Sequence, residues 1–135
     1  AARRAYEAAG VRAEVVPFIA DMAESYGWAD LVVCRAGALT VSELACAGVG
    51  AILVPFPAAV DDHQTHNARY LVNEGAALLI DDRELTAERL AGELATLCAG
   101  RGRLISMAER ARLLARPRAT AELAGACLRV AGAAA

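Results

Sequence analysis

The amino-acid sequence predicts an α/β domain whose parallel sheet carries helices on both faces. Two observations predict this fold. Short segments that read as strands recur four times along the chain, and the clearest of them are apolar runs without polar alternation, typical of strands that are covered on both faces. Segments with apolar residues at helical spacing separate these runs, and parallel strands need such helical crossovers. A chain of 135 residues is long enough for one domain with its own core.

The predicted strands are short, and turn residues follow them closely. They span Ala13–Val16, Leu31–Cys34, Ala51–Val54 and Ala77–Ile80. Pro17 ends the first strand because proline has no backbone N–H, and Pro55 stiffens the exit of the third. In parallel sheets ligands bind beyond the carboxyl ends of the strands, so we expect functional residues there.

Helices are predicted where capping residues precede apolar residues at three- and four-residue spacing. Asp21 is the expected N-cap of a helix that runs to about Ala29, and Gly10, Gly48 and Gly75 each end a helix. The other predicted helices span Ala1–Ala9, Thr40–Ala47, His63 or Gln64 to Asn73, Thr86–Cys98, Leu104–Ala115 and Thr120–Val130, with a break at Gly100–Gly102.

Composition argues against several classes of protein. A net charge of −2 is not the electrostatic footprint of a nucleic-acid-binding protein. No apolar run reaches the roughly 18 to 20 residues that cross a bilayer. No secretory signal peptide is recognisable, and the missing initiator methionine suggests a fragment. The four cysteines form no C-x-x-C pair, so we expect reduced cysteines in the core of a cytoplasmic protein.

The stretch Leu31–Glu43 has the clearest functional pattern. A buried strand feeds a turn of small residues, and a helix follows from Thr40. This arrangement points free backbone N–H groups beyond the carboxyl end of the sheet. Together with the helix dipole, those N–H groups favour an anion such as a phosphate.

Two interpretations of this helix start remain open from spacing alone. Thr40 and Glu43 have the T-x-x-E spacing of a capping box, in which the helix start is closed on itself. Alternatively, the amides of residues 38–40 hold a phosphate while Glu43 reaches a sugar hydroxyl. Arg35 either stacks on the planar base of a nucleotide or is a solvated loop arginine. Spacing does not decide between these two roles.

Polar residues crowd together after the third predicted strand. Within seven positions the chain carries Asp61, Asp62, His63, Gln64, His66 and Asn67. Three interpretations remain open for them. A metal site would use Asp62, His63 and His66. Helix capping would use Asp61 or Asp62 as the N-cap. A polyol site would use the amides and an imidazole at the helix start to bind sugar hydroxyls.

These two functional stretches together resemble the C-terminal domain of the MurG family of UDP-N-acetylglucosamine transferases. The resemblance runs from about Ala13 to Val130. It depends on the ordered motifs PFI-DM, ADLVV-R-GA-TVSE, VPFP, DDHQ-NA and MAERAR, which are specific in combination although no single one is.

The resemblance implies the C-terminal half of a glycosyltransferase B architecture, with a Rossmann-like parallel sheet. Residues 1–135 would form part of the UDP-GlcNAc-binding donor domain, and the N-terminal acceptor domain would be absent. The implied reaction inverts the anomeric centre and moves GlcNAc from UDP-GlcNAc to lipid I, giving lipid II for peptidoglycan synthesis. The resemblance implies no cofactor and no metal. It implies a peripheral protein on the cytoplasmic face of the bacterial plasma membrane.

The resemblance also implies which residues bind UDP-GlcNAc. The backbone of Ile19 would meet the uracil edge, Arg35 would lie by the uracil, and Glu43 would bond the ribose hydroxyls. The amides on the diphosphate would be those of Ala38, Leu39 and Thr40. The residues that reach the GlcNAc hydroxyls would be His63 and Gln64, with Asn67 close by.

The chain departs from the family in ways that limit what we expect of it. It begins after the strand and glycine-rich loop that also touch the diphosphate, and the acceptor domain with its general base is absent, so we expect these residues alone to be inactive. Gly50 stands where proline would be common and is expected to loosen that turn. The alternatives are another UDP-sugar transferase or a UDP-GlcNAc 2-epimerase of the same architecture, or a non-catalytic sugar-nucleotide-binding module.

Overall fold

The computed structural model describes residues 1–58 and 62–132 of the chain. At its centre lies a three-stranded parallel sheet in the order β1-β2-β3. The strands are β1 (Val32–Cys34), β2 (Ala51–Leu53) and β3 (Ala77–Leu79). Their register pairs Val33 with Ile52, and Ile52 with Leu78. The parallel sheet that the sequence predicts is confirmed.

Two helices begin at side-chain caps that lie where the sequence predicts a helix start. Asp21 Oδ1 accepts a hydrogen bond from Glu24 N at 2.8 Å, and Thr86 Oγ1 accepts one from Arg89 N at 3.1 Å. The helices of the described residues are α1 (Ala2–Ala8), α2 (Met22–Trp28), α3 (Ala38–Ala47), α4 (His63–Val72), the 3-10 turn η2 (Asp82–Glu84), α5 (Ala87–Cys98), α6 (Arg101–Leu113) and α7 (Ala119–Val130). Among these residues, every helix is too short or too polar to span a bilayer.

Helices cover both faces of the sheet, as predicted. Adjacent residues of β2 point to opposite faces, because side chains alternate along a strand. Leu53 belongs to a buried cluster with Leu44 of α3 and Leu71 of α4. Ile52 belongs to a second cluster with Leu97 of α5. Each fully buried Leu or Ile side chain contributes about 1.5–3 kcal/mol relative to an exposed one, so the two clusters hold the sheet between its helices.

Gly50, directly before β2, lets α6 approach the sheet closely. A Cβ atom at this position would lie 2.9 Å from Met107 Cβ, which is closer than carbon atoms pack without repulsion. Met107 is itself buried and belongs to the cluster of Ile52. This glycine therefore makes room for a packed side chain, and the expectation that it loosens its turn stays a prediction.

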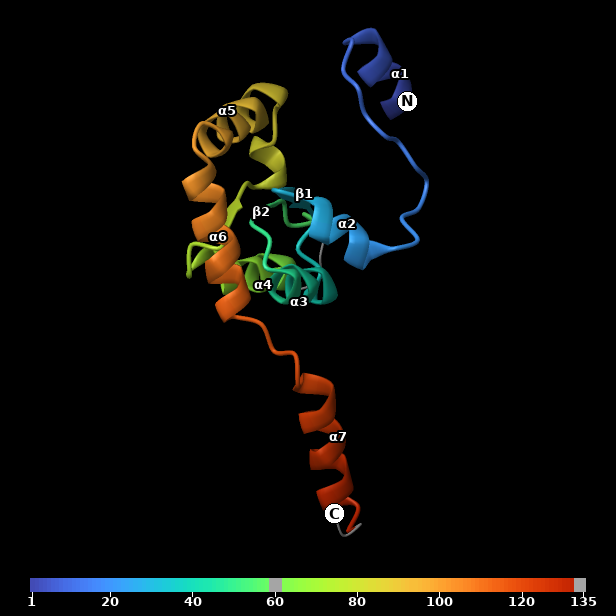
Figure 1. Cartoon of the computed structure of the whole chain (residues 1–135), viewed down its shortest axis with the longest axis vertical. Coiled ribbons are helices and arrows are strands. Elements are labelled where there is room, and N and C mark those ends of the chain that lie inside the picture. Colours follow the sequence, from blue (N-terminus) through green and yellow to red (C-terminus); the bar gives the residue numbers. More distant parts are fainter. Residues whose placement is uncertain (59–61, 133–135) are drawn as a thin grey trace.

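The predicted strand Ala13–Val16 is not formed. In the described part of the chain this segment is irregular, and only β1, β2 and β3 pair into a sheet. The Val15 carbonyl instead accepts a hydrogen bond from Arg3 Nη2 at 2.8 Å. Figure 1 shows α1 and the segment after it extending away from the sheet. An apolar run becomes a strand only when a neighbouring strand pairs its backbone groups, and this run has none beside it.

The expected core location of the cysteines is wrong for three of the four. Cys34 in β1 is partly buried, whereas Cys46, Cys98 and Cys127 are exposed. The three exposed thiols lie on helix surfaces or at a helix end, where an apolar sequence context did not translate into burial. All four cysteines are free, as expected.

Candidate functional site

Apart from Ile19, the predicted site residues lie at or shortly after the ends of β1 and β2. β1 leads through Arg35–Gly37 into α3, β2 leads into Val54–Phe56, and β3 leads into Ile80–Asp82. The strands are parallel, so these three exits lie at one edge of the sheet. The exits are joined to one another by hydrogen bonds from side chains, some of which belong to the exits and some to α4.

The helix after β1 begins two residues earlier than predicted, at Ala38. Gly37 is the N-cap with extended backbone, and the first helical bond runs from Val41 N to the Gly37 carbonyl at 3.0 Å. Thr40 is therefore the third residue of α3 rather than its cap, and the capping-box interpretation is wrong. Glycine has no side chain to accept from the first-turn amides, so the N–H groups of residues 38–40 have no partner within the helix.

Glu43 lies on the second turn of α3 and meets a residue that the sequence analysis did not identify. The phenol O–H of Tyr26, on α2, donates a hydrogen bond to Glu43 Oε2 at 3.1 Å. Partial burial and this carboxylate together raise the pKa of Tyr26 to about 12. The phenol thus stays protonated at neutral pH and remains a donor to Glu43.

The side chain of Arg35 is exposed, and its guanidinium contacts the exits of β2 and β3. Its Nη1 donates to the carbonyl oxygens of Val54 at 3.3 Å and Pro55 at 3.2 Å, and it forms an ion pair with Asp82. The guanidinium carbon lies 5.6 Å from the centre of the Phe56 ring, within the range of a cation–π contact. Asp82 follows β3, so the rule that ligand sites lie beyond strand ends already pointed toward it.

Gln64 and Asn67, on the first turns of α4, brace two of the exits. Gln64 Oε1 accepts hydrogen bonds from Ala36 N at 3.2 Å and from Phe56 N at 2.9 Å. Asn67 Nδ2 donates to the Ala36 carbonyl at 3.1 Å. One atom of each amide is thus bound to backbone, which leaves Gln64 Nε2 and Asn67 Oδ1 as the groups with hydrogen-bonding capacity for a ligand.

Asp62 is the N-cap of α4 by position, although its side chain caps no backbone amide. Its backbone is left-handed, with φ 53°, and Oδ1 accepts a hydrogen bond from Thr65 Oγ1 at 2.6 Å. His66 Nδ1 lies 3.1 Å from the Asp62 carbonyl oxygen. The described residues contain no group of three His, Cys, Asp or Glu side chains placed to hold a metal ion, which gives the metal interpretation no support. Asp61 lies outside the described residues.

The positions of two further predicted residues do not test their roles. His63 begins α4 and is exposed. Ile19 lies in the irregular segment before α2, and its side chain is exposed. Their roles therefore remain predictions.

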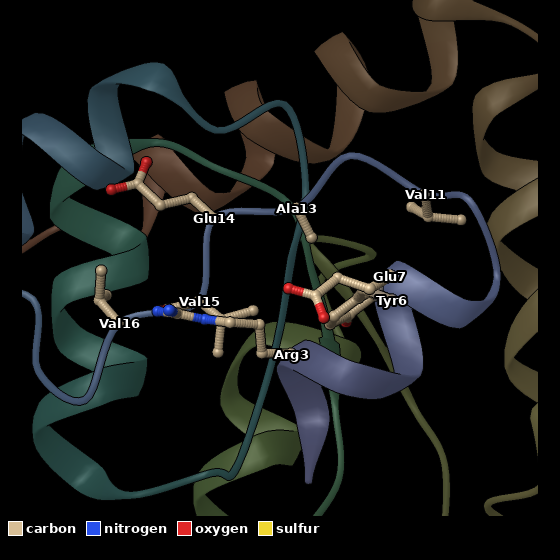
Figure 2. A pocket seen from close by; sticks show the side chains of 8 residues that line it. All are labelled: Arg3, Tyr6, Glu7, Val11, Ala13, Glu14, Val15 and Val16. Carbon is tan, nitrogen blue, oxygen red and sulfur yellow. The ribbon is translucent and has the colours of Figure 1, made fainter.

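A hollow of about 440 Å³ lies away from the strand exits, between α1 and residues 11–16. Figure 2 shows side chains of both segments around it, among them Arg3, Tyr6 and Val15. None of the predicted site residues lines this hollow. The strand exits, and not this hollow, are the candidate site.

Comparisons with known proteins identify the family of the chain. Residues 2–123 match the family model of the glycosyltransferase family 28 C-terminal domain. A UDP-N-acetylglucosamine--N-acetylmuramyl-(pentapeptide) pyrophosphoryl-undecaprenol N-acetylglucosamine transferase from Marinobacter nauticus is 61% identical over 131 residues, covering 97% of this chain and 36% of the relative. A relative of the same name from Nitrosococcus oceani is 61% identical over 127 residues, covering 94% of this chain and 35% of the relative.

A solved structure gives the same result. The crystal structure of Acinetobacter baumannii MurG superposes with a TM-score of 0.80 at 47% identity, covering 89% of this chain and 36% of that one. The chain thus spans about a third of the length of the proteins it matches. The resemblance that the sequence motifs predict is confirmed, and the chain belongs to glycosyltransferase family 28, in which it corresponds to the C-terminal domain.

Proposed function

We propose that this chain is the donor-binding part of an inverting glycosyltransferase that moves GlcNAc from UDP-GlcNAc to lipid I, giving lipid II. The observation that carries the proposal is the start of α3 at the β1 exit. Gly37 leaves the first-turn amides without a side-chain cap, and Glu43 presents a carboxylate on the next turn. The names of two relatives at 61% identity support UDP-GlcNAc as the donor.

The diphosphate of the donor would bind at the N-terminus of α3. The N–H groups of Ala38, Leu39 and Thr40 and the helix dipole favour an anion at this position. Negative charge on the diphosphate grows as the glycosidic bond breaks, so fixed donors stabilise the transition state more than the bound substrate. In comparable oxyanion sites one such donor contributes roughly 10²- to 10³-fold to kcat.

The uridine would lie between Glu43 and Arg35. A carboxylate that accepts from two vicinal ribose hydroxyls discriminates against deoxyribose, since the missing hydroxyl would leave an acceptor unpaired. Arg35 is already fixed by Asp82 and the β2 exit, so its guanidinium would meet the uracil without losing much conformational freedom. The backbone of Ile19 would complete recognition of the uracil edge.

The GlcNAc group would contact the start of α4. His63 is exposed at the first position of that helix. Gln64 would offer its Nε2, because its Oε1 is engaged by two backbone amides. Asn67 would offer its Oδ1, because its Nδ2 donates to the Ala36 carbonyl.

The remaining functions of the enzyme belong to residues outside this chain, which covers about a third of its relatives. We place the lipid I site, the general base and the membrane-facing surface in an N-terminal acceptor domain. The complete protein would act peripherally on the cytoplasmic face of the plasma membrane. The 135 residues alone would not convert lipid I to lipid II.

Ligand-observed NMR tests the donor site directly. Saturation transfer from the protein to UDP-GlcNAc should persist in competition with UDP-glucose, GDP and dTDP, and it should be lost in Glu43→Ala. Transfer that survives Glu43→Ala unchanged would remove Glu43 from the site. Absence of UDP-GlcNAc binding by the full-length protein would refute the proposed function.

A further inference from the structure

We propose that Tyr26 is a positioning residue for ribose recognition, acting by holding the Glu43 carboxylate toward the two ribose hydroxyls. The inference depends on the proposed function, because it assigns a role within the same nucleotide site. Tyr26 would not touch the nucleotide. It would act only through its hydrogen bond to Glu43 Oε2, at 3.1 Å.

The two side chains differ in how firmly the fold holds them. The Tyr26 ring packs against the buried cluster that contains Leu44 of α3, so its position is set by the packing of α2 on α3. Glu43 is exposed and has three rotatable side-chain bonds. An exposed glutamate that must be ordered by its ligand loses conformational entropy on binding. A phenol whose ring packs on the core orders that carboxylate before the ligand arrives.

The Glu43 carboxylate has enough hydrogen-bonding capacity to accept from Tyr26 and from ribose at the same time. An ionised carboxylate offers about four lone-pair sites on its two oxygens. The Tyr26 phenol occupies one site on Oε2. The remaining sites suffice for two vicinal hydroxyls, so positioning by Tyr26 and binding of ribose are compatible.

A purely structural role for Tyr26 makes a different prediction. If its hydrogen bond only tied α2 to α3, losing it would weaken the whole fold and affect every nucleotide alike. If it positions Glu43, losing it would affect only nucleotides that carry ribose hydroxyls. UDP and 2′,3′-dideoxy-UDP differ in these hydroxyls alone, and therefore separate the two roles.

The test uses Tyr26→Phe in the full-length protein that contains this chain, with affinities for both nucleotides measured by calorimetry. Tyr26→Phe should weaken UDP binding by about 5- to 10-fold, which lies within the range expected for the loss of one typical intramolecular hydrogen bond. It should change the affinity for 2′,3′-dideoxy-UDP by less than about 2-fold. In a Glu43→Ala background, Tyr26→Phe should have no further effect on UDP, because the carboxylate it positions is gone.

Tyr70→Phe is the matched control. It removes the same phenol oxygen, which in Tyr70 donates to the Leu114 carbonyl at 2.8 Å and not to Glu43. Tyr70→Phe should leave both affinities unchanged. If Tyr26→Phe does not fold, ¹³C-labelled tyrosine in the unmodified protein decides instead: UDP should shift the Tyr26 ring resonance, and 2′,3′-dideoxy-UDP should not.

The outcomes separate this inference from the proposed function. If Tyr26→Phe weakens the binding of both nucleotides equally, or weakens the binding of neither, the positioning role is overturned. The proposed donor site is not affected by either result. A Tyr26 resonance that responds equally to both nucleotides would overturn it too. Failure of the unmodified protein to bind UDP would refute the proposed function, and this inference with it.

Discussion

Gln64 joins two strand exits, so its removal should reduce the stability of the chain by a measurable amount. Its Oε1 accepts from Ala36 N at 3.2 Å and from Phe56 N at 2.9 Å. We predict that Gln64→Leu lowers the free energy of unfolding by about 1–3 kcal/mol. Each lost hydrogen bond accounts for about 1 kcal/mol. Loss of the bond to the Ala36 amide should cost the most, because Ala36 is fully buried and water replaces its partner least easily.

Urea unfolding of the chain measures this loss. With a slope of about 1–3 kcal/mol per molar urea, a loss of about 2 kcal/mol moves the midpoint by roughly 1 M. Gln64→Glu is the matched control, since a carboxylate keeps an acceptor for both amides while the NH₂ group is removed. Asn73→Ala removes an exposed amide from the other end of α4 and should change the free energy of unfolding by less than about 0.5 kcal/mol.

The two substitutions at Gln64 must differ for the reasoning to hold. Equal midpoints for Gln64→Leu and Gln64→Glu would show that the Oε1 acceptor contributes nothing to stability. A large loss in both variants would attribute the effect to side-chain packing instead. Only a loss confined to Gln64→Leu supports the brace between the β1 and β2 exits.

Three further predictions follow from packing and titration. Gly50→Ala should destabilise the chain by about 1–3 kcal/mol, because the new Cβ would lie 2.9 Å from Met107 Cβ. Gly92→Ala, in open space on α5, should stabilise the chain by about 0.5–1 kcal/mol. Changes of the same sign in the free energy of unfolding of the two variants would contradict this prediction. Burial raises the pKa of Cys34 from 9.0 to about 11. Iodoacetamide at about pH 8 should therefore label Cys34 on the order of 100-fold more slowly than the three exposed cysteines. Equal labelling rates, measured by mass spectrometry, would count against the raised pKa. The folded-state pKa of Tyr26 is raised from 10.0 to about 12, so the stability that this shift provides is present below the lower pKa and is lost as pH rises through the higher one. The free energy of unfolding, measured over this pH range, should therefore fall less steeply in Tyr26→Phe than in the unmodified chain. Parallel curves for the two proteins would contradict the shift.

Local signals predicted much of the fold because they act through neighbouring residues. Asp21 and Thr86 cap α2 and α5 through amides three residues away, so the sequence alone contains both partners of each bond. The strand prediction at Ala13–Val16 was wrong for the opposite reason. The partner that would make this segment a strand is a separate piece of backbone, and no local pattern supplies it.

The start of α3 shows why a motif can fit two structures. Thr40 and Glu43 keep the capping-box spacing, yet the helix extends back to Ala38 because Ala38 and Leu39 are good helix formers. Gly37 can act as an N-cap without offering a side chain to the first-turn amides. Spacing predicted a helix after this turn but placed its start two residues too late, and the register decides whether those amides are open to a ligand.

The contacts that order the site were beyond sequence analysis, and they change how substitutions there must be interpreted. Tyr26 and Glu43 lie 17 positions apart, and Arg35 and Asp82 lie 47 apart, so only the packed fold brings them together. Gln64 uses one atom to brace the backbone and has another to offer a ligand. An alanine substitution at such a residue removes both functions and lowers activity in either case. Substitutions that keep one atom and change the other, such as Gln64→Glu, are therefore the ones that separate preorganisation of the site from contact with the donor.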